Sequence, residues 1–288
     1  MMEVVQDPSE LRARCDAARA AGERVGVVPT MGALHAGHLS LVDAARDHGG
    51  TYLVATIFVN PLQFAPTDDL DRYPRPLAED IERCRAAGVA LLFAPEPRSM
   101  YPEGFSTYVE VEGVTGRLEG EHRPGHFRGV TTVVTKLLNL AGPCVAAFGR
   151  KDYQQWRTLA RMVQDLDMPI EVVGSKIVRD ADGLALSSRN RYLSAPDRER
   201  ALGLVGGLRS AWDAFEAGER DAAELLSRAA TPVRRAFDRV DYVALADADD
   251  LRPIEGPLPS RVLLAAAAHL GGTRLIDNVV LGEDPRPR

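Results

Sequence analysis

The chain has little of several features that mark common protein classes. Its 288 residues include three cysteines, Cys15, Cys84 and Cys144, which lie far apart and outside any CxxC spacing. This argues against a disulfide framework or a cysteine zinc site and favours cysteines packed as small core side chains. No apolar run approaches transmembrane length, and the start MMEVVQDPSE has no basic region followed by an apolar segment. We therefore expect a cytoplasmic protein that does not bind membranes.

An excess of positive charge is also missing. The formal net charge is -6 and no block of like charge runs long, so the sequence offers no footprint for nucleic acid or for an acidic lipid surface. Only three of the 35 basic residues are lysines, namely Lys136, Lys151 and Lys176. Because arginine is the usual basic residue in this chain, a lysine inside a motif is a stronger indication of a specific role than it would be in a lysine-rich protein. A content of 45% hydrophobic and 26% charged residues is ordinary for a globular protein with a sizeable core.

Short apolar runs rich in β-branched residues alternate with helical patterns over the first 175 residues. The patterns predict strands at 24–28, 52–59, 89–95, 144–149 and 170–175, and helices at 8–21, 37–48, 76–87, 129–140 and 152–166. This alternation predicts an α/β fold with a doubly wound, parallel, Rossmann-like sheet covered by helices on both faces. Ligands of such a sheet bind beyond the carboxyl ends of its strands.

The alternation of strand and helix patterns ends after Ser175. A loop, RDADGLALSSRNRYLS, is followed by two helical patterns at 196–217 and 221–237 and by three strand candidates, DYVALAD, RVLLAAAAHL and TRLIDNVVL. We expect a smaller α+β domain here, with a catalytic domain at 1–177 and this second domain at 178–288. The final GEDPRPR is expected to fray.

Two histidines, His35 and His38, lie where the first strand gives way to a helix, in PTMGALHAGH. The chain has no HExxH, no GxxxxGK[ST] and no GxGxxG after this strand, which argues against a zinc site of that type and the two commonest phosphate loops. The free N–H groups and dipole of a helix start attract anions, and Gly32 and Gly37 leave room for phosphate oxygens. This position favours phosphate binding over a structural role for the pair.

HAGH resembles the HxGH signature of the nucleotidylyltransferase superfamily, in which both histidines meet ATP phosphates. Further strings follow in order: IFVNPLQF, YPR, LEGEHRPGHFRGV, FGRKDYQQ, DGLALSSRNRYL and RLIDN. From about Val25 to Asn278 their order and spacing resemble the pantothenate synthetase (pantoate–β-alanine ligase) family. The resemblance implies a homodimer that uses ATP, with Mg²⁺, to convert pantoate into an adenylate, whose AMP is then displaced by the amine of β-alanine.

The resemblance also implies which residues act on ATP. His38 is the expected proton donor, and Lys151 is expected to place a compact positive charge on the reacting phosphate. The LSSR run, similar to the KMSKS loop of the superfamily, supplies hydroxyl and guanidinium donors for the triphosphate. The expected catalytic residues are His35, His38, Lys151 and Arg189. Further ATP contacts are expected from Met31, Gly149, Asp152, Val178, Leu186, Ser187 and Ser188.

For pantoate the resemblance points to the amides of Gln63 and Gln155, which can both donate and accept hydrogen bonds. The other matching positions near the second substrate are Asn60, Tyr73, Arg123 and His126. Glu79 and Asp80 are weak candidates for the outer shell of Mg²⁺, because adjacent acids also typify a solvated helix face.

One position departs from the family pattern. Where FGEKD is expected the chain reads FGRKD, so Arg150 replaces an acid beside Lys151. The Arg150 side chain either adds positive potential near the triphosphate or points to solvent. Two other functions stay open. One is an adenylyltransferase acting on a phosphate ester, which would have no use for the paired glutamines. The other is a nucleotide-sensing module without chemistry, for which Arg150 is the only hint.

Overall fold

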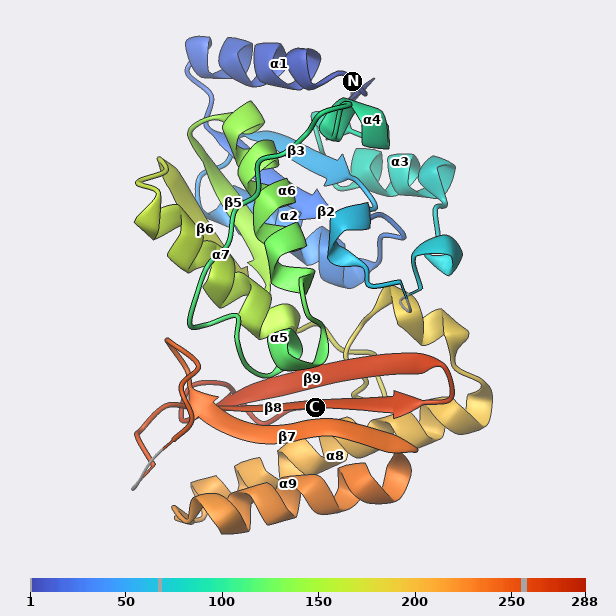
Figure 1. The fold of residues 1–288 in the computed structure, drawn as a ribbon, viewed down its shortest axis with the longest axis vertical. Coiled ribbons are helices and arrows are strands. Elements are labelled where there is room, and N and C mark those ends of the chain that lie inside the picture. The colour runs from blue at the N-terminus through green and yellow to red at the C-terminus, as the bar shows by residue number, and fades with distance from the viewer. Residues whose placement is uncertain (1, 67–68, 255–257) are drawn as a thin grey trace. The chain divides into compact units, whose positions relative to one another are not determined.

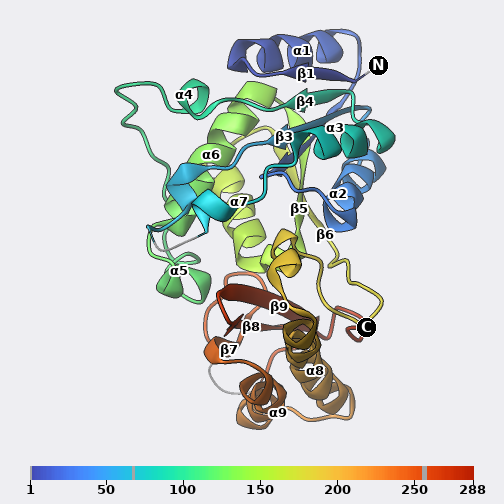
Figure 2. The same cartoon turned by 90° about the vertical axis from the view of Figure 1, so that its right-hand side faces the viewer.

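The computed structural model describes residues 2–66, 69–254 and 258–288, and Figures 1 and 2 show it from two directions. The chain forms two compact units. The first unit consists of Met1–Thr115, Arg123–Arg150 and Gln155–Lys176, and the second unit of Gly116–His122, Lys151–Gln154 and Ile177–Arg288. Two short segments of the second unit are therefore inserted in the sequence of the first. The simpler division into domains 1–177 and 178–288 stays a proposal.

The first unit is built on a six-stranded parallel sheet in the order β1-β4-β3-β2-β5-β6. Its strands are β1 (Glu3–Val5), β2 (Val25–Thr30), β3 (Tyr52–Ile57), β4 (Leu91–Phe93), β5 (Cys144–Gly149) and β6 (Ile170–Ser175). Its helices are α1 (Pro8–Ala20), α2 (Ala36–Asp47), α3 (Leu77–Ala86), α4 (Pro97–Met100), α6 (His126–Ala141) and most of α7 (Tyr153–Asp165), with 3₁₀ turns η1 (Pro61–Gln63) and η2 (Leu70–Arg72). The 3₁₀ turn η3 (Arg150–Asp152) and the first two residues of α7 lie mainly in the segment Lys151–Gln154 of the second unit. The parallel order confirms the predicted fold class.

Two separate cores lie on the two faces of this sheet. One is formed by the sheet with α1, α6 and α7, and the other by the sheet with α2 and α3; Figure 2 shows α6 and α7 on one side of the strands and α2 and α3 on the other. Because both faces are covered, β5 reads as an uninterrupted apolar run. The cysteines are buried and free, as expected, and burial raises the pKa of Cys15 to about 11, so this thiol stays protonated and inert.

The expected and observed elements of this unit differ mainly in short segments. Strand β1 has no counterpart among the predictions, because it has three residues and only Val5 is buried. Helix α6 starts at His126, three residues before its expected first residue 129. Strand β4 is limited to Leu91–Phe93 within the expected 89–95. The remaining boundaries agree within about two residues, the usual uncertainty at element ends.

The second unit contains a three-stranded antiparallel sheet, β7-β8-β9, with two long helices packed on it. Its elements are α5 (Glu119–His122), η4 (Ser188–Tyr192), α8 (Ala195–Glu216), α9 (Ala222–Ala236), β7 (Arg239–Asp247), β8 (Val262–Leu270) and β9 (Thr273–Leu281). Alanines at 265–268 of β8 are buried, which lets the helices approach the central strand closely. The smaller α+β architecture is confirmed.

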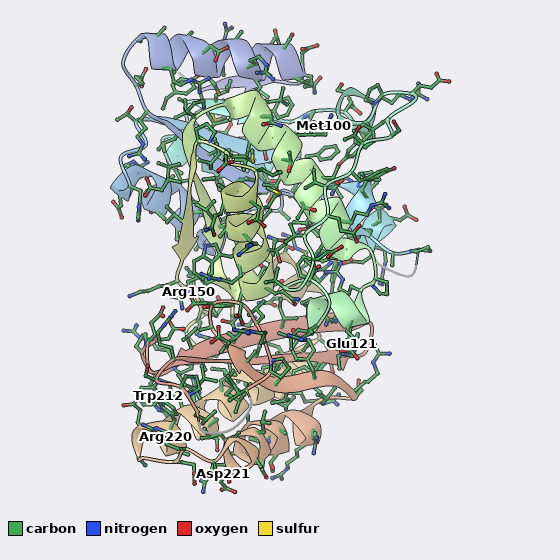
Figure 3. All side chains as sticks on the ribbon, turned by 60° about the vertical axis from the view of Figure 1, so that its left-hand side comes forward. Met100, Glu121, Arg150, Trp212, Arg220 and Asp221 are labelled. Carbon is green, nitrogen blue, oxygen red and sulfur yellow. The ribbon has the colours of Figure 1, made fainter. Side chains whose placement is uncertain are left out.

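The expectation that the last residues fray is wrong. The indole of Trp212 on α8, labelled in Figure 3, donates to the carbonyl of Asp284 at 3.1 Å. The Arg286 guanidinium pairs with Asp213 at 2.6 Å, and Arg209 donates to the carbonyl of Pro287 at 3.0 Å. These contacts to one helix tie the segment down. Among the described residues, no helix combines the length and apolar character needed to cross a bilayer.

Candidate active site

The HAGH segment begins at the carboxyl end of β2, the strand between β3 and β5 in the sheet. The turn before it is tight: Gly32 and Ala33 both have left-handed backbone angles, with φ of 83° and 50°. This conformation is easy for glycine and unfavourable for alanine. The segment therefore needs external support to hold its shape.

Asp80 on α3 supplies that support. Its two carboxylate oxygens accept hydrogen bonds from the backbone N–H groups of Ala33 (2.8 Å) and Leu34 (2.7 Å), and Arg83 from the same helix donates to the carbonyl of Leu34. Asp80 is only 1% exposed, so its reading as part of a solvated helix face is wrong. A carboxylate that accepts backbone N–H groups with both oxygens is already hydrogen-bonded as a structural anchor rather than presented to a metal hydration shell.

The two histidine rings lie against each other, tilted by 36°, at the start of α2. His35 is the N-cap, and its ring centroid lies 4.1 Å from that of His38. The backbone N–H of His35 donates to Nδ1 of His38 at 3.3 Å. Because a backbone N–H can only donate, Nδ1 of His38 is the accepting nitrogen, and the neutral ring carries its proton on Nε2. His38 is thus set up as a hydrogen-bond donor through Nε2 at a helix N-terminus.

A second polar group lies where β3 leads into η1. Asn60 is buried and donates to Oε1 of Gln63 at 2.9 Å, and Nε2 of Gln63 donates to Sδ of Met31 at 3.2 Å. Nδ1 of His126 donates to the carbonyl of Gln63 at 2.9 Å, so its Nε2 is the acceptor for Arg123 at 3.1 Å. These contacts bring five of the sequence-predicted residues together within the first unit.

A pocket of about 330 Å³ opens beside this group. It is lined by Leu62, Gln63, Phe64, Ala65, Pro66, Tyr108, Arg123, Pro124, Gly125, His126, Arg128 and Gly129. The charged residues on its wall are arginines, which suits a carboxylate-bearing ligand. Tyr73 is buried, with its ring edge-on to that of Phe64 at 5.9 Å.

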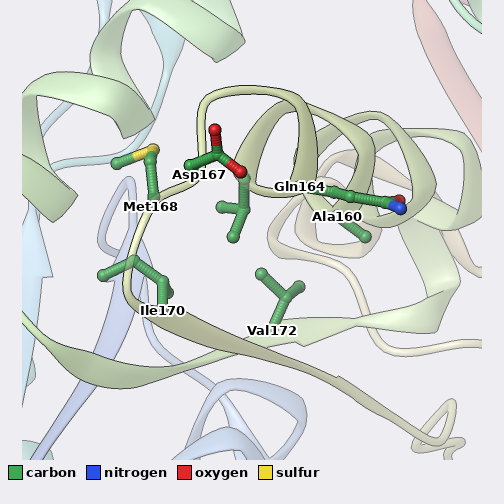
Figure 4. Close-up of a pocket in the computed structure, with 7 residues that line it drawn as sticks. Ala160, Gln164, Asp167, Met168, Ile170 and Val172 are labelled. Carbon is green, nitrogen blue, oxygen red and sulfur yellow. The ribbon is translucent and has the colours of Figure 1, made fainter.

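A larger pocket, of about 490 Å³, contains no predicted site residue. Figure 4 shows it between the end of α7 and β6, with Asp167 and Met168 at the turn and Ile170 and Val172 on the strand. It therefore opens beside the amino end of β6. Ligands of doubly wound sheets bind at the opposite, carboxyl edge, so the smaller pocket is the stronger candidate.

Lys151 directly follows the carboxyl end of β5 in the sequence, two residues after Gly149. Its carbonyl accepts a hydrogen bond from Asn278 of the RLIDN string at 2.8 Å, and its ammonium lies 3.7 Å from the Asp152 carboxylate. The neighbouring Arg150, labelled in Figure 3, places its guanidinium 5.6 Å from the ring centre of Trp156 on α7. This cation–π contact is a packing role that neither interpretation of the departure anticipated. Gln155 is half-buried in the first turn of α7.

The remaining predicted ATP contacts, like Lys151 and Asp152, belong to the second unit. The backbone N–H of Leu186 donates to the carbonyl of Val178 at 2.9 Å, which closes the loop between them. Ser187 caps η4 by accepting the N–H of Arg189 at 3.3 Å, so Ser188 and Arg189 open a helical turn. Arg179 at the base of this loop forms a buried pair with Asp277 at 2.6 Å. The loop is therefore held in a defined conformation by its own unit.

Sequence reasoning missed three residues that shape this site. Asp80 was considered only for Mg²⁺, Tyr101 lies outside every quoted string, and Gly129 lies inside one without being singled out. Tyr101 donates to Oδ1 of Asn60 at 2.7 Å across 41 residues of sequence. A long-range hydrogen bond of this kind leaves no local pattern. Among the described residues, no group of three or more histidine, cysteine or acidic side chains could hold a metal ion.

Comparisons with known proteins agree with this architecture. A family model described as pantoate-beta-alanine ligase matches residues 3–280. A pantothenate synthetase of Moorella thermoacetica is 52% identical, covering 97% of this chain and 99% of the relative, and one of Syntrophotalea carbinolica is 50% identical over 98% and 100%.

Solved structures show the same similarity. A crystal structure of pantothenate synthetase from Thermus thermophilus superposes with a TM-score of 0.91 at 45% identity, covering 96% of this chain and 99% of that one. The pantoate-beta-alanine ligase of Francisella tularensis, solved as a complex with beta-gamma ATP and beta-alanine, superposes with a TM-score of 0.78 at 30% identity, over 99% and 100% of the two chains. Taken with the fold and the ordered motifs, these matches show that the chain belongs to the pantoate-beta-alanine ligase family.

Proposed function

We propose that the chain activates pantoate with ATP and joins it to β-alanine in two steps. A carboxylate is a poor electrophile, so one of its oxygens must first become part of a leaving group. The pantoate carboxylate attacks the α-phosphate of ATP, which gives pantoyl adenylate and releases pyrophosphate. The amine of β-alanine then attacks the acyl carbon, the bond to AMP breaks, and a proton is lost from the nitrogen. The products are pantothenate and AMP.

The observation that carries the proposal is the arrangement at the carboxyl edge of the sheet in the first unit. His38 presents an Nε2 donor at the start of α2, and the arginine-lined pocket beside Gln63 suits a small carboxylic acid. Adenylyl transfer requires chiefly such positioning and the neutralisation of charge on the departing pyrophosphate. His35, Lys151 and Arg189 are proposed to share that second task.

Further ATP contacts are proposed for Met31, Gly149, Asp152, Val178, Leu186, Ser187 and Ser188, and further substrate contacts for Asn60, Tyr73, Gln155 and Arg123. Mg²⁺ is proposed to enter with ATP, bound mainly through phosphate oxygens and water, which requires few protein ligands. Glu79 stays a weak candidate for the outer shell of Mg²⁺; its side chain is exposed and lies 3.9 Å from Arg83. The homodimer is likewise a proposal.

Exchange of labelled pyrophosphate into ATP tests the reaction. We expect exchange that requires pantoate but not β-alanine, because activation precedes amide formation. In a single turnover without β-alanine, one equivalent of pyrophosphate per active site should be released. Exchange without pantoate, or strict dependence of pyrophosphate release on β-alanine, would contradict the two-step scheme.

A further inference from the structure

The backbone around Asn60 determines which side of its amide is the accepting oxygen and which is the donating NH₂ group. Its Oδ1 accepts the N–H of Leu62 at 3.3 Å, and its Nδ2 donates to the carbonyl of Gly129 at 3.1 Å. A backbone N–H can only donate and a carbonyl can only accept, so the amide has one arrangement that satisfies both. Asn60 is 1% exposed, and a reversed amide would bury two mismatched polar groups.

This arrangement determines which end of Gln63 faces the site. Because Nδ2 of Asn60 is a donor, the group of Gln63 beside it, at 2.9 Å, must be the accepting Oε1. The NH₂ group of Gln63 therefore points away from Asn60, where one N–H meets the thioether of Met31 at 3.2 Å. A thioether is a weak acceptor, so a ligand oxygen at this place would form the stronger bond.

Tyr101 contacts the oxygen of the Asn60 amide, whereas Gln63 contacts its NH₂ group. Since Oδ1 of Asn60 can only accept, the Tyr101 hydroxyl is the donor in their 2.7 Å contact. The Tyr101 ring is held by Phe58 and Phe105, whose ring centres lie 5.9 and 5.0 Å away. Burial raises the pKa of Tyr101, so the hydroxyl keeps the proton that it donates.

We propose that Tyr101, acting through Asn60, is a positioning residue that holds Gln63 as a hydrogen-bond donor toward pantoate. This inference rests on the proposed function and deepens it. The NH₂ group of Gln63 then donates to an oxygen of pantoate, in the carboxylate or a hydroxyl, while its Oε1 keeps the hydrogen bond from Asn60. Gly129 allows the arrangement, because a Cβ there would lie 2.3 Å from the carbonyl of Leu62 and push η1 away from α6.

Two variants test the direction of the hydrogen bonds. Tyr101→Phe removes only the hydroxyl, and we expect the Kd for pantoate to rise about fivefold, the scale of one buried hydrogen bond. Asn60→Asp retains the shape but cannot donate when ionised, so Gln63 must turn its NH₂ inward and its oxygen toward the ligand. For this variant we expect the Kd to rise more than about tenfold, because a donor becomes a repelling acceptor.

The measurement is calorimetric titration of pantoate into the full chain with a non-hydrolysable ATP analogue present. For Tyr101→Phe, the Kd for the analogue and the kcat should change less than about twofold, since loss of a contact made equally in ground and transition states leaves kcat unchanged. Tyr52→Phe, at the amino end of β3, is the matched control and should bind pantoate as the unmodified chain does.

Four outcomes are distinguishable. Selective weakening of pantoate binding in both variants supports the inference. Unchanged pantoate binding in Tyr101→Phe overturns it, as does parallel loss of pantoate binding, nucleotide binding and thermal stability, which would mean a merely structural tyrosine. An unmodified chain that neither binds pantoate nor shows pantoate-dependent pyrophosphate exchange would reject the proposed function itself, and the inference with it.

Discussion

The carboxylate of Asp80 lies 2.7 Å from the backbone nitrogen of Leu34, the residue directly before His35. A second oxygen of the same carboxylate holds Ala33, whose left-handed backbone would otherwise be unfavourable. One buried acid on α3 thus fixes the turn that delivers both histidines of HAGH. It stabilises the turn through backbone N–H groups.

Asp80→Asn is expected to weaken both folding and adenylation. An amide has only one accepting atom, so one of the two N–H groups loses its partner inside the protein. An unsatisfied buried group of this kind costs about 1–3 kcal/mol. We expect a fall of that size in the free energy of unfolding, measured by urea denaturation, and at least a tenfold fall in pantoate-dependent pyrophosphate exchange, on the scale that misplaced catalytic groups show.

The neighbouring acid provides the control. Glu79→Gln changes an exposed carboxylate that lies 3.9 Å from Arg83, and such a pair contributes at most about 0.5 kcal/mol. Near-normal exchange in Asp80→Asn, or an equal loss in Glu79→Gln, would refute the anchoring role.

Lys151→Ala is expected to leave the fold intact and to reduce pantoyl adenylate formation by at least about a hundredfold, the scale for losing one charge contact in the transition state. The measurement is the burst of adenylate in rapid-quench kinetics. Lys136→Ala on α6, where the ammonium lies 5.0 Å from the Phe105 ring centre, removes the same charge away from the strand ends and should retain the burst. A normal burst in Lys151→Ala would remove this residue from the catalytic set.

Gly129→Ala and Gly206→Ala are expected to act in opposite directions. At Gly129 a Cβ would lie 2.3 Å from the carbonyl of Leu62, and overpacking of a buried contact costs about 1–3 kcal/mol. At Gly206, inside α8, a Cβ meets nothing within 4 Å, so alanine should stabilise the helix by about 0.5–1 kcal/mol. Thermal unfolding measures both. A neutral Gly129→Ala would show that α6 and η1 separate easily.

The sequence predicts this fold well where the signal is periodic and long. Strand β5 and helix α7 were found because strands buried on both faces are continuous apolar runs, whereas helices keep one polar side. Strand β1 could not be found, because three residues with one buried side chain carry no period. The position of HAGH can be predicted from the sequence, because it follows a predicted strand of the sheet. The role of Asp80 as the anchor of this segment cannot be predicted in the same way. A carboxylate that bonds backbone N–H groups 46 residues away has the same local sequence as an exposed one.

Asp241→Asn is expected to destabilise the second unit at neutral pH and much less in acid. Burial raises the pKa of the Asp241 carboxyl, but hydrogen bonds from Arg274 and His269 outweigh this and hold the pKa below its usual value. The ionised form therefore stabilises the fold above the unfolded-state pKa, and that contribution disappears as the pH falls through the lower folded-state pKa. Loss of one partner of such a buried cluster costs about 3 kcal/mol.

The measurement is denaturant unfolding of both proteins at pH 7 and at successively lower pH. The difference in the free energy of unfolding between the unmodified chain and Asp241→Asn should become smaller below about pH 4. Asp16→Asn, in an exposed pair with Arg19, should cost less than about 1 kcal/mol at either pH. A gap that is constant with pH would mean that the charge of Asp241 contributes nothing.

The inserted segment Gly116–His122 limits how this enzyme can be taken apart or recombined. Glu119 in this segment forms a two-pronged pair with Arg274, at 2.6 and 2.7 Å, and accepts the hydroxyl of Tyr242. The next residues in the chain, Arg123 and His126, already belong to the other unit and contact Gln63. A gene fragment ending at residue 177 would therefore encode Glu119 without its cationic partner. In a chimaera made from two homologues, Glu119 and Arg274 would come from the same protein only if residues 116–122 were exchanged together with the carboxyl-terminal half.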